Sequence, residues 1–254
     1  MDTLALSLAF KGERFHGWQT QKNAVTVQQT LTEALEQLTG FPASLHGCGR
    51  TDAGVHAAVY VASWRGSCRI PLDNLPPALN ARLPRDISVK RAWHAEEDFH
   101  ARFSCLKKRY TYSFYRGDVP DPFYRDYAVF TPGALDLAAM EEAAIAFVGR
   151  HDFAAVRSLG TPLSSTVRTL FECRLEEKGP LLRVHMPGDG FLYNMARTIA
   201  GTLLYVGRGK LEPGAIPSLL TGGDRKQAGP CLGAEGLCLT GLWYNGFQLE
   251  ASWF

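Results

Sequence analysis

Apolar and polar residues alternate at the start of the chain and then change to a helical period. Leucine and phenylalanine occupy every second position from residue 4 to residue 10, which is typical of a half-buried strand. Residues 27–38 place apolar side chains on one helical face, and a Thr-x-x-Gln capping box at 26–29 precedes them. Gly40 follows as a helix stop. The opening of the chain therefore predicts a strand followed by a helix.

The same two periods predict the remaining secondary structure. Short links between grouped strands, with helices interspersed, favour the α+β class over a doubly wound fold. The two halves have similar content, so we expect two related subdomains with mainly antiparallel sheets flanked by helices, over residues 1–104 and 105–254. The expected elements are strands at 43–48, 58–64, 87–93, 109–115 and 237–244, a hairpin of 170–176 with 181–186, and helices at 72–83, 135–148 and 191–206.

The composition is that of an ordinary globular protein. Of the 254 residues, 46% are hydrophobic and 20% are charged. No apolar run reaches the roughly 18 residues that a membrane helix needs, and Asp2 stands where a signal peptide carries basic residues. These features predict a cytoplasmic protein with no membrane contact.

The six cysteines are scattered, and no two of them form a Cys-x-x-Cys pair. Such spacing does not fit a structural zinc site, and a chain of this size does not need a disulfide scaffold. The sequence also lacks a dinucleotide-binding fingerprint and a phosphate-binding loop. We therefore expect free thiols, and the sequence gives no indication of a bound metal or a nucleotide cofactor.

The net charge of +2 does not by itself indicate a nucleic-acid partner. Between Arg82 and Arg125, however, ten basic residues are interleaved with aromatic ones. Basic groups contact phosphates and aromatic rings stack on exposed bases. Composition alone favours another interpretation, in which the basic residues cover a solvated strand face and the aromatic residues form the core behind it. The aromatic residues are Trp93, Phe99, Phe103, Tyr110, Tyr112, Phe114 and Tyr115.

One turn between two predicted strands carries candidate chemistry. It reads GRTDAGVHA over residues 49–57 and places the guanidinium of Arg50 two residues from the carboxylate of Asp52. Loops on a rigid scaffold often hold catalytic groups, and an ionised aspartate can act as a nucleophile. Aspartate and glycine are also ordinary turn residues, so this stretch alone indicates no more than a turn.

Two further stretches stand in order with this turn. The first reads FHARFSC over 99–105 and continues as KRYTY over 108–112, and the second reads GDGFLYNMAR over 188–197. In order and spacing the three stretches resemble the bacterial tRNA pseudouridine synthase A family, and the resemblance covers essentially the whole chain. It implies the pseudouridine synthase fold, a homodimer, and a tRNA substrate bound at its anticodon stem-loop.

The resemblance also implies the reaction, which turns uridine into pseudouridine at tRNA positions 38 to 40. The bond from ribose C1′ to base N1 breaks, and C5 of the uracil joins C1′ instead. No redox step or group donor takes part, so the family needs no cofactor. A nucleophile must attack C1′ or C6 of the uridine and leave again later, and a carboxylate can do both.

Five residues match the family's site. Asp52 matches the nucleophile, and Arg197 matches the arginine that pairs with it, although a surface arginine on a helix is the plain alternative. Tyr110 matches the tyrosine that stacks on the target uracil; its hydroxyl is a candidate acceptor of the C5 proton, and an aromatic pair with Tyr112 is the alternative. Arg50 contacts a phosphate or fills the space of the flipped base, and Leu237 packs under the uracil.

One segment departs from the family pattern, which commonly has an Ala-Pro-Ala-like run before Gly-Leu-x-Leu, whereas residues 230–235 read PCLGAE. We expect a structural role for His56 and a cap or turn role for Asp152. A catalytically inactive RNA-binding relative is the main alternative function. An unrelated aspartate-dependent hydrolase would need a second carboxylate or a metal cluster, and the sequence shows neither.

Overall fold

The computed structural model describes residues 2–158, 160 and 164–251. Contacts within the chain divide it into two compact units. Unit 1 combines Met1–Leu106 with Leu239–Phe254, and unit 2 is Lys107–Cys238. The sequence prediction assigns residues 239–254 to the second subdomain, whereas the structure joins them to unit 1.

Hydrogen bonds explain why the end of the chain joins unit 1. The hydroxyl of Tyr244 donates to the carbonyl of Ala101 over 2.7 Å, and the amide of Leu106 donates to the carbonyl of Trp243 over 2.8 Å. These partners lie more than a hundred residues apart in the sequence, so no local pattern could have predicted the pairing.

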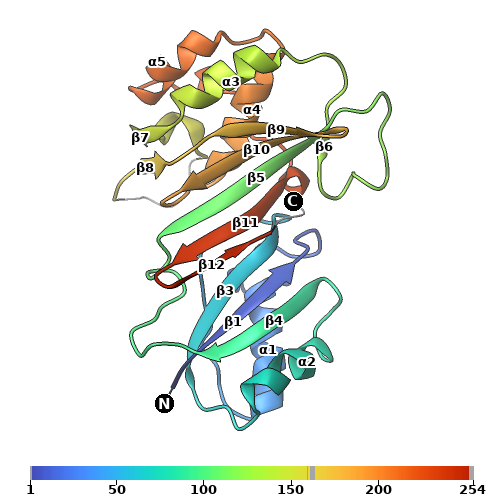
Figure 1. Ribbon diagram of the computed structural model, residues 1–254, viewed down its shortest axis with the longest axis vertical. Helices are drawn as coiled ribbons and strands as arrows, with labels where there is room; N and C mark the ends of the chain where they lie inside the picture. The colour runs from blue at the N-terminus through green and yellow to red at the C-terminus, as the bar shows by residue number, and fades with distance from the viewer. Residues whose placement is uncertain (1, 159, 161–163, 252–254) are drawn as a thin grey trace. The chain divides into compact units, whose positions relative to one another are not determined.

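The strands of unit 1 follow the order β4-β1-β3-β11, and the pairs of β1 with β3 and with β4 are antiparallel (Figure 1). β12 pairs with β11, and the short β2 pairs with β3. The predicted strand at 43–48 thus shrinks to two residues. The strands are β1 (Asp2–Phe10), β2 (His46–Gly47), β3 (His56–Gly66), β4 (Ile87–His94), β11 (Leu237–Tyr244) and β12 (Phe247–Glu250).

The first strand is buried on both faces, although its alternating pattern predicts burial of one face. Leu4, Leu6 and Leu8 are at most 1% exposed, as expected. Ala5 and Ser7 on the opposite face are 0% and 8% exposed. The small side chains on the second face are buried, like the leucines on the first. The sequence pattern, in which large apolar and small residues alternate, therefore looked like a strand with one buried face.

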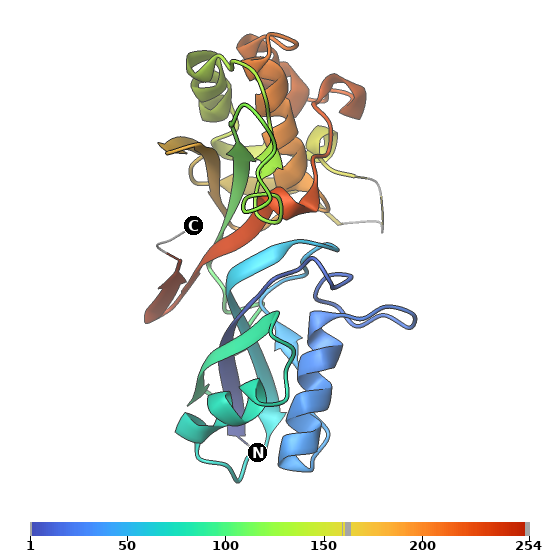
Figure 2. The same cartoon turned by 90° about the vertical axis from the view of Figure 1, so that its right-hand side faces the viewer.

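Two helices accompany the strands of unit 1, and α1 (Val27–Thr39) runs alongside them (Figure 2). The hydroxyl of Thr26 accepts a hydrogen bond from the amide of Gln29 as the predicted N-cap, and Gly40 ends the helix with φ of 76°. The predicted helix at 72–83 is shorter, with a 3₁₀ turn η1 (Leu72–Asn74) and α2 (Leu75–Asn80). Its two prolines lie in the first turn of α2, where no backbone donor is needed.

The strands of unit 2 follow the order β5-β10-β8-β7 (Figure 1). β9 pairs with β10, and β6 adds a short parallel pair to β5. Both units are therefore mixed, with mainly antiparallel sheets flanked by helices, and the predicted fold class is confirmed. The strands are β5 (Lys107–Tyr115), β6 (Val129–Phe130), β7 (Gly149–Asp152), β8 (Val167–Leu170), β9 (Arg174–Lys178) and β10 (Leu181–Gly188).

The helices of unit 2 begin later than the sequence periodicity predicts. α4 begins at Met195 and not at residue 191, because Asn194 has a left-handed backbone with φ of 59°.

The predicted strand at 170–176 is divided between β8 and β9. The helices are α3 (Leu137–Ala146), α4 (Met195–Gly207) and α5 (Ile216–Leu220), with 3₁₀ turns η2 (Ala154–Val156), η3 (Pro213–Ala215), η4 (Arg225–Gln227) and η5 (Ala234–Gly236). Among the described residues, no helix is long and apolar enough to cross a membrane.

α4 is nearly enclosed and lies against the backbone of the segment that precedes β11. A Cβ built on Gly201 would lie 1.9 Å from the carbonyl oxygen of Pro230, and one on Gly229 would lie 2.3 Å from the carbonyl oxygen of Gly201. The amide of Gly229 donates to the hydroxyl of Thr202 over 3.0 Å. Glycine therefore permits this backbone approach, which holds residues 229–233 beside the helix.

We expect Gly201→Ala to lower the free energy of unfolding by about 1–3 kcal/mol, as overpacking of a tight core does. Urea unfolding followed by circular dichroism measures the change. Gly214→Ala is the matched control, because a Cβ there meets no atom within 4 Å. Equal stability of the two variants would contradict the close approach.

Candidate functional site

The loop with Asp52 links β2 to β3 and is held by main-chain hydrogen bonds to residues 12–18. The amide of Gly54 donates to the carbonyl of Phe15 over 3.1 Å, and the amide of Trp18 donates to the carbonyl of Thr51 over 3.3 Å. A turn closes on Asp52 itself, whose carbonyl accepts from the amide of Val55 over 3.1 Å. The position of the Asp52 backbone is thus fixed on both sides.

Two glycines bring this supporting segment close to the loop. A Cβ on Gly12 would lie 2.0 Å from the carbonyl oxygen of Val55, and one on Gly17, where φ is +80°, would lie 2.2 Å from that of Thr51. The amide of Gly12 also donates to Nδ1 of His56 over 3.0 Å. His56 is 2% exposed, so its expected structural role in fixing the loop is confirmed.

The side chains of the loop differ in exposure. Asp52 is half-buried and Arg50 is exposed. Thr51 between them is 7% exposed, and its hydroxyl has no hydrogen-bond partner among the described residues. Beneath the loop the rings of Trp18 and Tyr60 stack at 4.3 Å, and the hydroxyl of Tyr60 donates to the carbonyl of Gly49. A packed aromatic base therefore supports a loop that presents a carboxylate and a guanidinium.

In unit 2, Tyr110 lies on β5 opposite Met186 of β10 and is 7% exposed. Its ring meets that of Phe191 edge-on, with centroids 4.9 Å apart. Tyr112 lies two residues along the same strand face, but its ring pairs with Phe114 at 5.1 Å. The described ring contacts of Tyr110 are thus with a residue of the GDGFLYNMAR stretch.

Tyr112 is tied to the segment before β11. Its hydroxyl donates to the carbonyl of Gly233 over 2.8 Å. Burial, followed by the nearby Glu235, raises the pKa of Tyr112 far above its ordinary value, and the positive charge of Arg197 opposes this. Tyr112 therefore acts as a neutral hydrogen-bond donor that fixes this segment, and Arg197 lies within electrostatic range of it.

Arg197 occupies the first turn of α4 and is held by two acceptors. Its Nη1 donates to Oδ1 of Asn194 over 2.8 Å, and its Nε donates to the carbonyl of Leu232 over 2.7 Å. Asn194 is held in turn, because its Nδ2 donates to the hydroxyl of Ser158 over 2.9 Å. The predicted shared side of Asn194 and Arg197 is confirmed, and the guanidinium is oriented by the protein itself.

These bonds give the unusual segment 230–235 a defined part in the site. It supplies main-chain carbonyls to Arg197 and Tyr112, and a Cβ on Gly236 would lie 2.6 Å from the Tyr112 ring. Backbone contacts do not depend on side-chain identity, so a departure in sequence is compatible with the same support. Leu237 follows at the start of β11 and is 4% exposed.

The structure thus describes two sets of predicted residues, each within its own unit. Arg50 and Asp52 share the loop of unit 1, and Tyr110 and Arg197 stand on β5 and α4 of unit 2. The ion pair between Asp52 and Arg197 stays a prediction. Sequence reasoning missed two contacts. The ring of Phe191 contacts Tyr110, and the motif at 188–197 that contains Phe191 could have indicated it. The Leu232 carbonyl accepts from Arg197, and a main-chain acceptor leaves no signal in a sequence.

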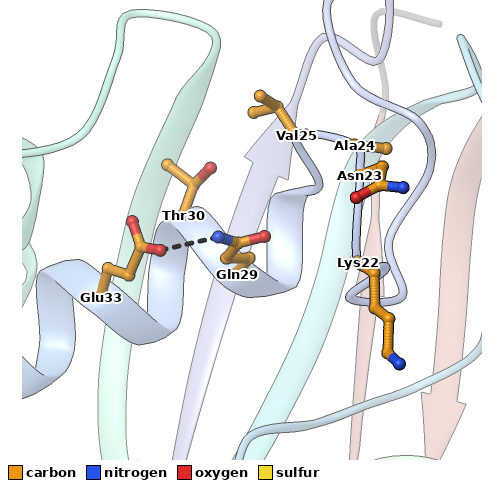
Figure 3. A pocket seen from close by; sticks show the side chains of 7 residues that line it. All are labelled: Lys22, Asn23, Ala24, Val25, Gln29, Thr30 and Glu33. Atoms are coloured by element: carbon orange, nitrogen blue, oxygen red, sulfur yellow. Dashed lines mark hydrogen bonds between the residues drawn. The ribbon is translucent and has the colours of Figure 1, made fainter.

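Three other features lie outside this arrangement. Oδ1 of Asp152 accepts from the amide of Ala154 over 2.9 Å, which confirms its expected turn role. Within the described ranges, no cluster of three His, Cys, Asp or Glu residues could hold a metal ion. A pocket of about 330 Å³ opens between the turn at Lys22 and Asn23 and the first turns of α1 (Figure 3). Its lining includes Gln29 and Glu33, joined by a 2.8 Å hydrogen bond, but not the Asp52 loop.

The sequence of the chain matches the model of one known protein family over most of its length. The sequence model of a family described as tRNA pseudouridine synthase matches residues 7–104 and 143–245. These segments contain Arg50, Asp52, Arg197 and Leu237, whereas Tyr110 lies between them. A solved chain from a Cbf5-Nop10-Gar1 complex is a distant likeness, with a TM-score of 0.33, 12% identity, and coverage of 79% of this chain and 54% of that one.

Three bacterial relatives match over nearly their full length. The tRNA pseudouridine synthase A 2 of Clostridium perfringens is 39% identical, and the tRNA pseudouridine synthase A of Acetivibrio thermocellus is 41% identical; each alignment covers 96% of this chain and 100% of the relative. The tRNA pseudouridine synthase A of Syntrophomonas wolfei is 43% identical over 96% of this chain and 98% of its own. On these matches the chain belongs to the tRNA pseudouridine synthase family.

Proposed function

We propose that this protein converts uridine to pseudouridine at positions 38 to 40 in the anticodon stem-loop of tRNA. The observation that carries the proposal is the whole-chain match to tRNA pseudouridine synthases, together with a half-buried Asp52 on a loop with a fixed backbone. The reaction is an isomerisation in which the C1′–N1 bond breaks and a C1′–C5 bond forms. The proton lost from C5 is balanced by the one gained at N1, so no co-reactant is consumed.

Asp52 is the nucleophile in this proposal and attacks C1′ or C6 of the target uridine. The loop supports this role because its backbone is bonded to residues 12–18, so the carboxylate needs little reorganisation when the substrate arrives. The adjacent Thr51 hydroxyl adds a buried polar group without a described partner. Asp52 is half-buried, which leaves it accessible to a flipped nucleotide.

Arg197 keeps the Asp52 carboxylate ionised through an ion pair. A guanidinium suits this role because it remains charged at any working pH. In the bonds to Leu232 and Asn194 the donors are Nε and Nη1 of the guanidinium. The third nitrogen, Nη2, donates in neither of these two bonds. Since its orientation is set before any substrate binds, an ion pair formed by Arg197 costs little side-chain entropy.

The other three residues bind the nucleotide. Tyr110 stacks on the uracil, and its hydroxyl accepts the C5 proton late in the reaction, directly or through a water. Leu237 packs under the uracil, and its burial at the start of β11 is consistent with an apolar floor. Arg50 is exposed and either contacts a phosphate or fills the space of the flipped base, which offsets the unstacking cost of a few kcal/mol.

We also propose that the protein acts as a homodimer in the cytoplasm, as the resemblance implies. Analytical ultracentrifugation of the purified protein, with and without tRNA, tests the dimer. A monomer in both conditions would contradict it without affecting the chemistry assigned to Asp52.

We expect Asp52→Asn to abolish pseudouridine formation while tRNA binding stays within about twofold, because the amide keeps the shape of the side chain but cannot act as a nucleophile. The fall in kcat should be at least about a thousandfold, as for loss of other catalytic nucleophiles. Tritium release from tRNA labelled at uracil C5 measures it.

Asp73→Asn is the control for this substitution, because Asp73 is an exposed aspartate in η1 and should leave turnover unchanged. Normal turnover by Asp52→Asn would contradict the nucleophile. Tight tRNA binding by the unaltered protein with no tritium release would instead favour the inactive RNA-binding relative. Mapping pseudouridine in tRNA from a strain without this protein identifies the positions that it modifies.

We expect Tyr110→Phe to keep KM for tRNA within about twofold, because the ring still stacks, and to lower kcat by about a hundredfold, which is the lower end of general base catalysis. Single-turnover rates across pH separate the proton-transfer step from binding. Full activity of Tyr110→Phe would show that the hydroxyl is not the proton acceptor, while a loss confined to Tyr110→Ala would leave stacking as its only role.

A further inference from the structure

Only one of the seven aromatic residues from Trp93 to Tyr115 presents an exposed ring. Tyr110, Tyr112 and Phe114 are buried. The other packed rings are Trp93 against Phe247, Phe99 against Tyr244 and Phe247, and Tyr115 against Tyr124. Phe103 is 75% exposed. The expectation that aromatic residues of this stretch form the core therefore holds for Tyr110, Tyr112 and Phe114. Trp93, Phe99 and Tyr115 are half-buried against other rings, and Phe103 is left to be explained.

The turn that carries Phe103 is rigidly attached to unit 1. The amide of Ala101 donates to the hydroxyl of Ser63 over 3.0 Å, and the carbonyl of Ala101 accepts from the hydroxyl of Tyr244 over 2.7 Å. Nδ1 of His100 accepts from the amides of Arg102 and Phe103 over 3.1 and 3.4 Å. Because the turn is already ordered, Phe103 can meet a ligand without the entropy cost of fixing a loop.

His100 and Arg102 lie beside the Phe103 ring, and His46 lies beside His100. The His100 ring lies 4.4 Å from that of Phe103, and the His46 ring lies 4.8 Å from that of His100. The Arg102 guanidinium stands 5.5 Å from the centre of the Phe103 ring. Burial, His46 and Arg102 all lower the pKa of His100, so this imidazole is neutral at neutral pH and forms an uncharged part of the stack.

We propose that His46, His100, Arg102 and Phe103 form a platform on which an unpaired base of the tRNA substrate stacks, with Arg102 contacting the adjacent phosphate. This inference rests on the proposed function. An exposed ring supplies a face for any base, and a neighbouring guanidinium supplies the charge complementary to the backbone. The combination of an exposed aromatic ring, neighbouring tilted imidazole rings and a cation fits a nucleotide better than an apolar protein surface.

The platform lies away from the reacting nucleotide. Ser63, which anchors the turn and pairs with His46, is seven residues along β3 from His56 at the end of the Asp52 loop. At about 3.3 Å per residue the separation is roughly 23 Å along the strand. A base stacked there contributes to holding the tRNA and takes no part in bond breaking, so its loss should raise KM and leave kcat unchanged.

The test measures Kd by filter binding and steady-state tritium release with the full protein and intact tRNA. We expect Phe103→Ala to raise both Kd and KM about tenfold, which lies in the range for loss of one base–aromatic stack, with kcat within twofold. Phe103→Tyr should restore binding. Arg102→Gln should weaken binding and reduce its dependence on salt. Thermal unfolding should be unchanged in all three, because both side chains are exposed.

Phe41→Ala is the matched control. Phe41 is 44% exposed and has the guanidinium of Arg69 at 5.9 Å from its ring. A loss of binding equal to that of Phe103→Ala, parent-like binding by Phe103→Ala, or a change in oligomeric state without a change in Kd would each overturn the platform. If the unaltered protein binds tRNA but forms no pseudouridine, and Phe103→Ala weakens that binding, the proposed function fails and the platform stands. If the unaltered protein is active and Phe103→Ala binds normally, only the platform fails.

Discussion

The close approach of main chain to main chain at Gly12 and Gly17 is the constraint on which the candidate site depends. It places the carbonyls of Thr51 and Val55 against a supporting segment that a side chain at either glycine would push away. The hydrogen bonds from Trp18 and Gly54 are possible only at this separation. In the proposed reaction, a loop held by its backbone positions the Asp52 carboxylate before substrate binds, and this is the form of preorganisation that favours a transition state.

In unit 2 a close approach of main chain to main chain at glycine residues orients the Arg197 guanidinium. Gly201 and Gly229 bring the backbone of residues 229–233 against α4, and this places the Leu232 carbonyl within 2.7 Å of the Arg197 guanidinium. The hydroxyl of Tyr112 fixes the neighbouring Gly233 carbonyl. Arg197 is thus oriented by main-chain and amide acceptors, neither of which carries a charge that would neutralise it.

The agreement between sequence and structure was best where the signal was local. The cap at Thr26, the stop at Gly40 and the strands at 87–93, 109–115 and 237–244 follow from short-range preferences that tertiary packing did not override. The start of α4 was missed because Asn194 adopts a left-handed backbone that a helical pattern cannot reveal. The double burial of β1 was missed because small residues on its second face carry no apolar signal. Motif spacing supplied Arg50, Asp52, Tyr110, Arg197 and Leu237 as candidate site residues, whose roles stay predictions, and it gave no account of what holds them.

By itself the sequence determined the family, the fold class and the residue types available for the chemistry, because motifs and periodicity are written in side-chain identity. The tertiary structure alone decided which groups fix those residues: the Leu232 carbonyl on Arg197, Phe191 on Tyr110, and the segment at 12–18 under the Asp52 loop. It also decided that Phe103 is exposed while its neighbours in the same aromatic run are packed. The physical reason is that backbone acceptors, close approaches and exposure are properties of distances between residues far apart in the chain, and such distances exist only after folding.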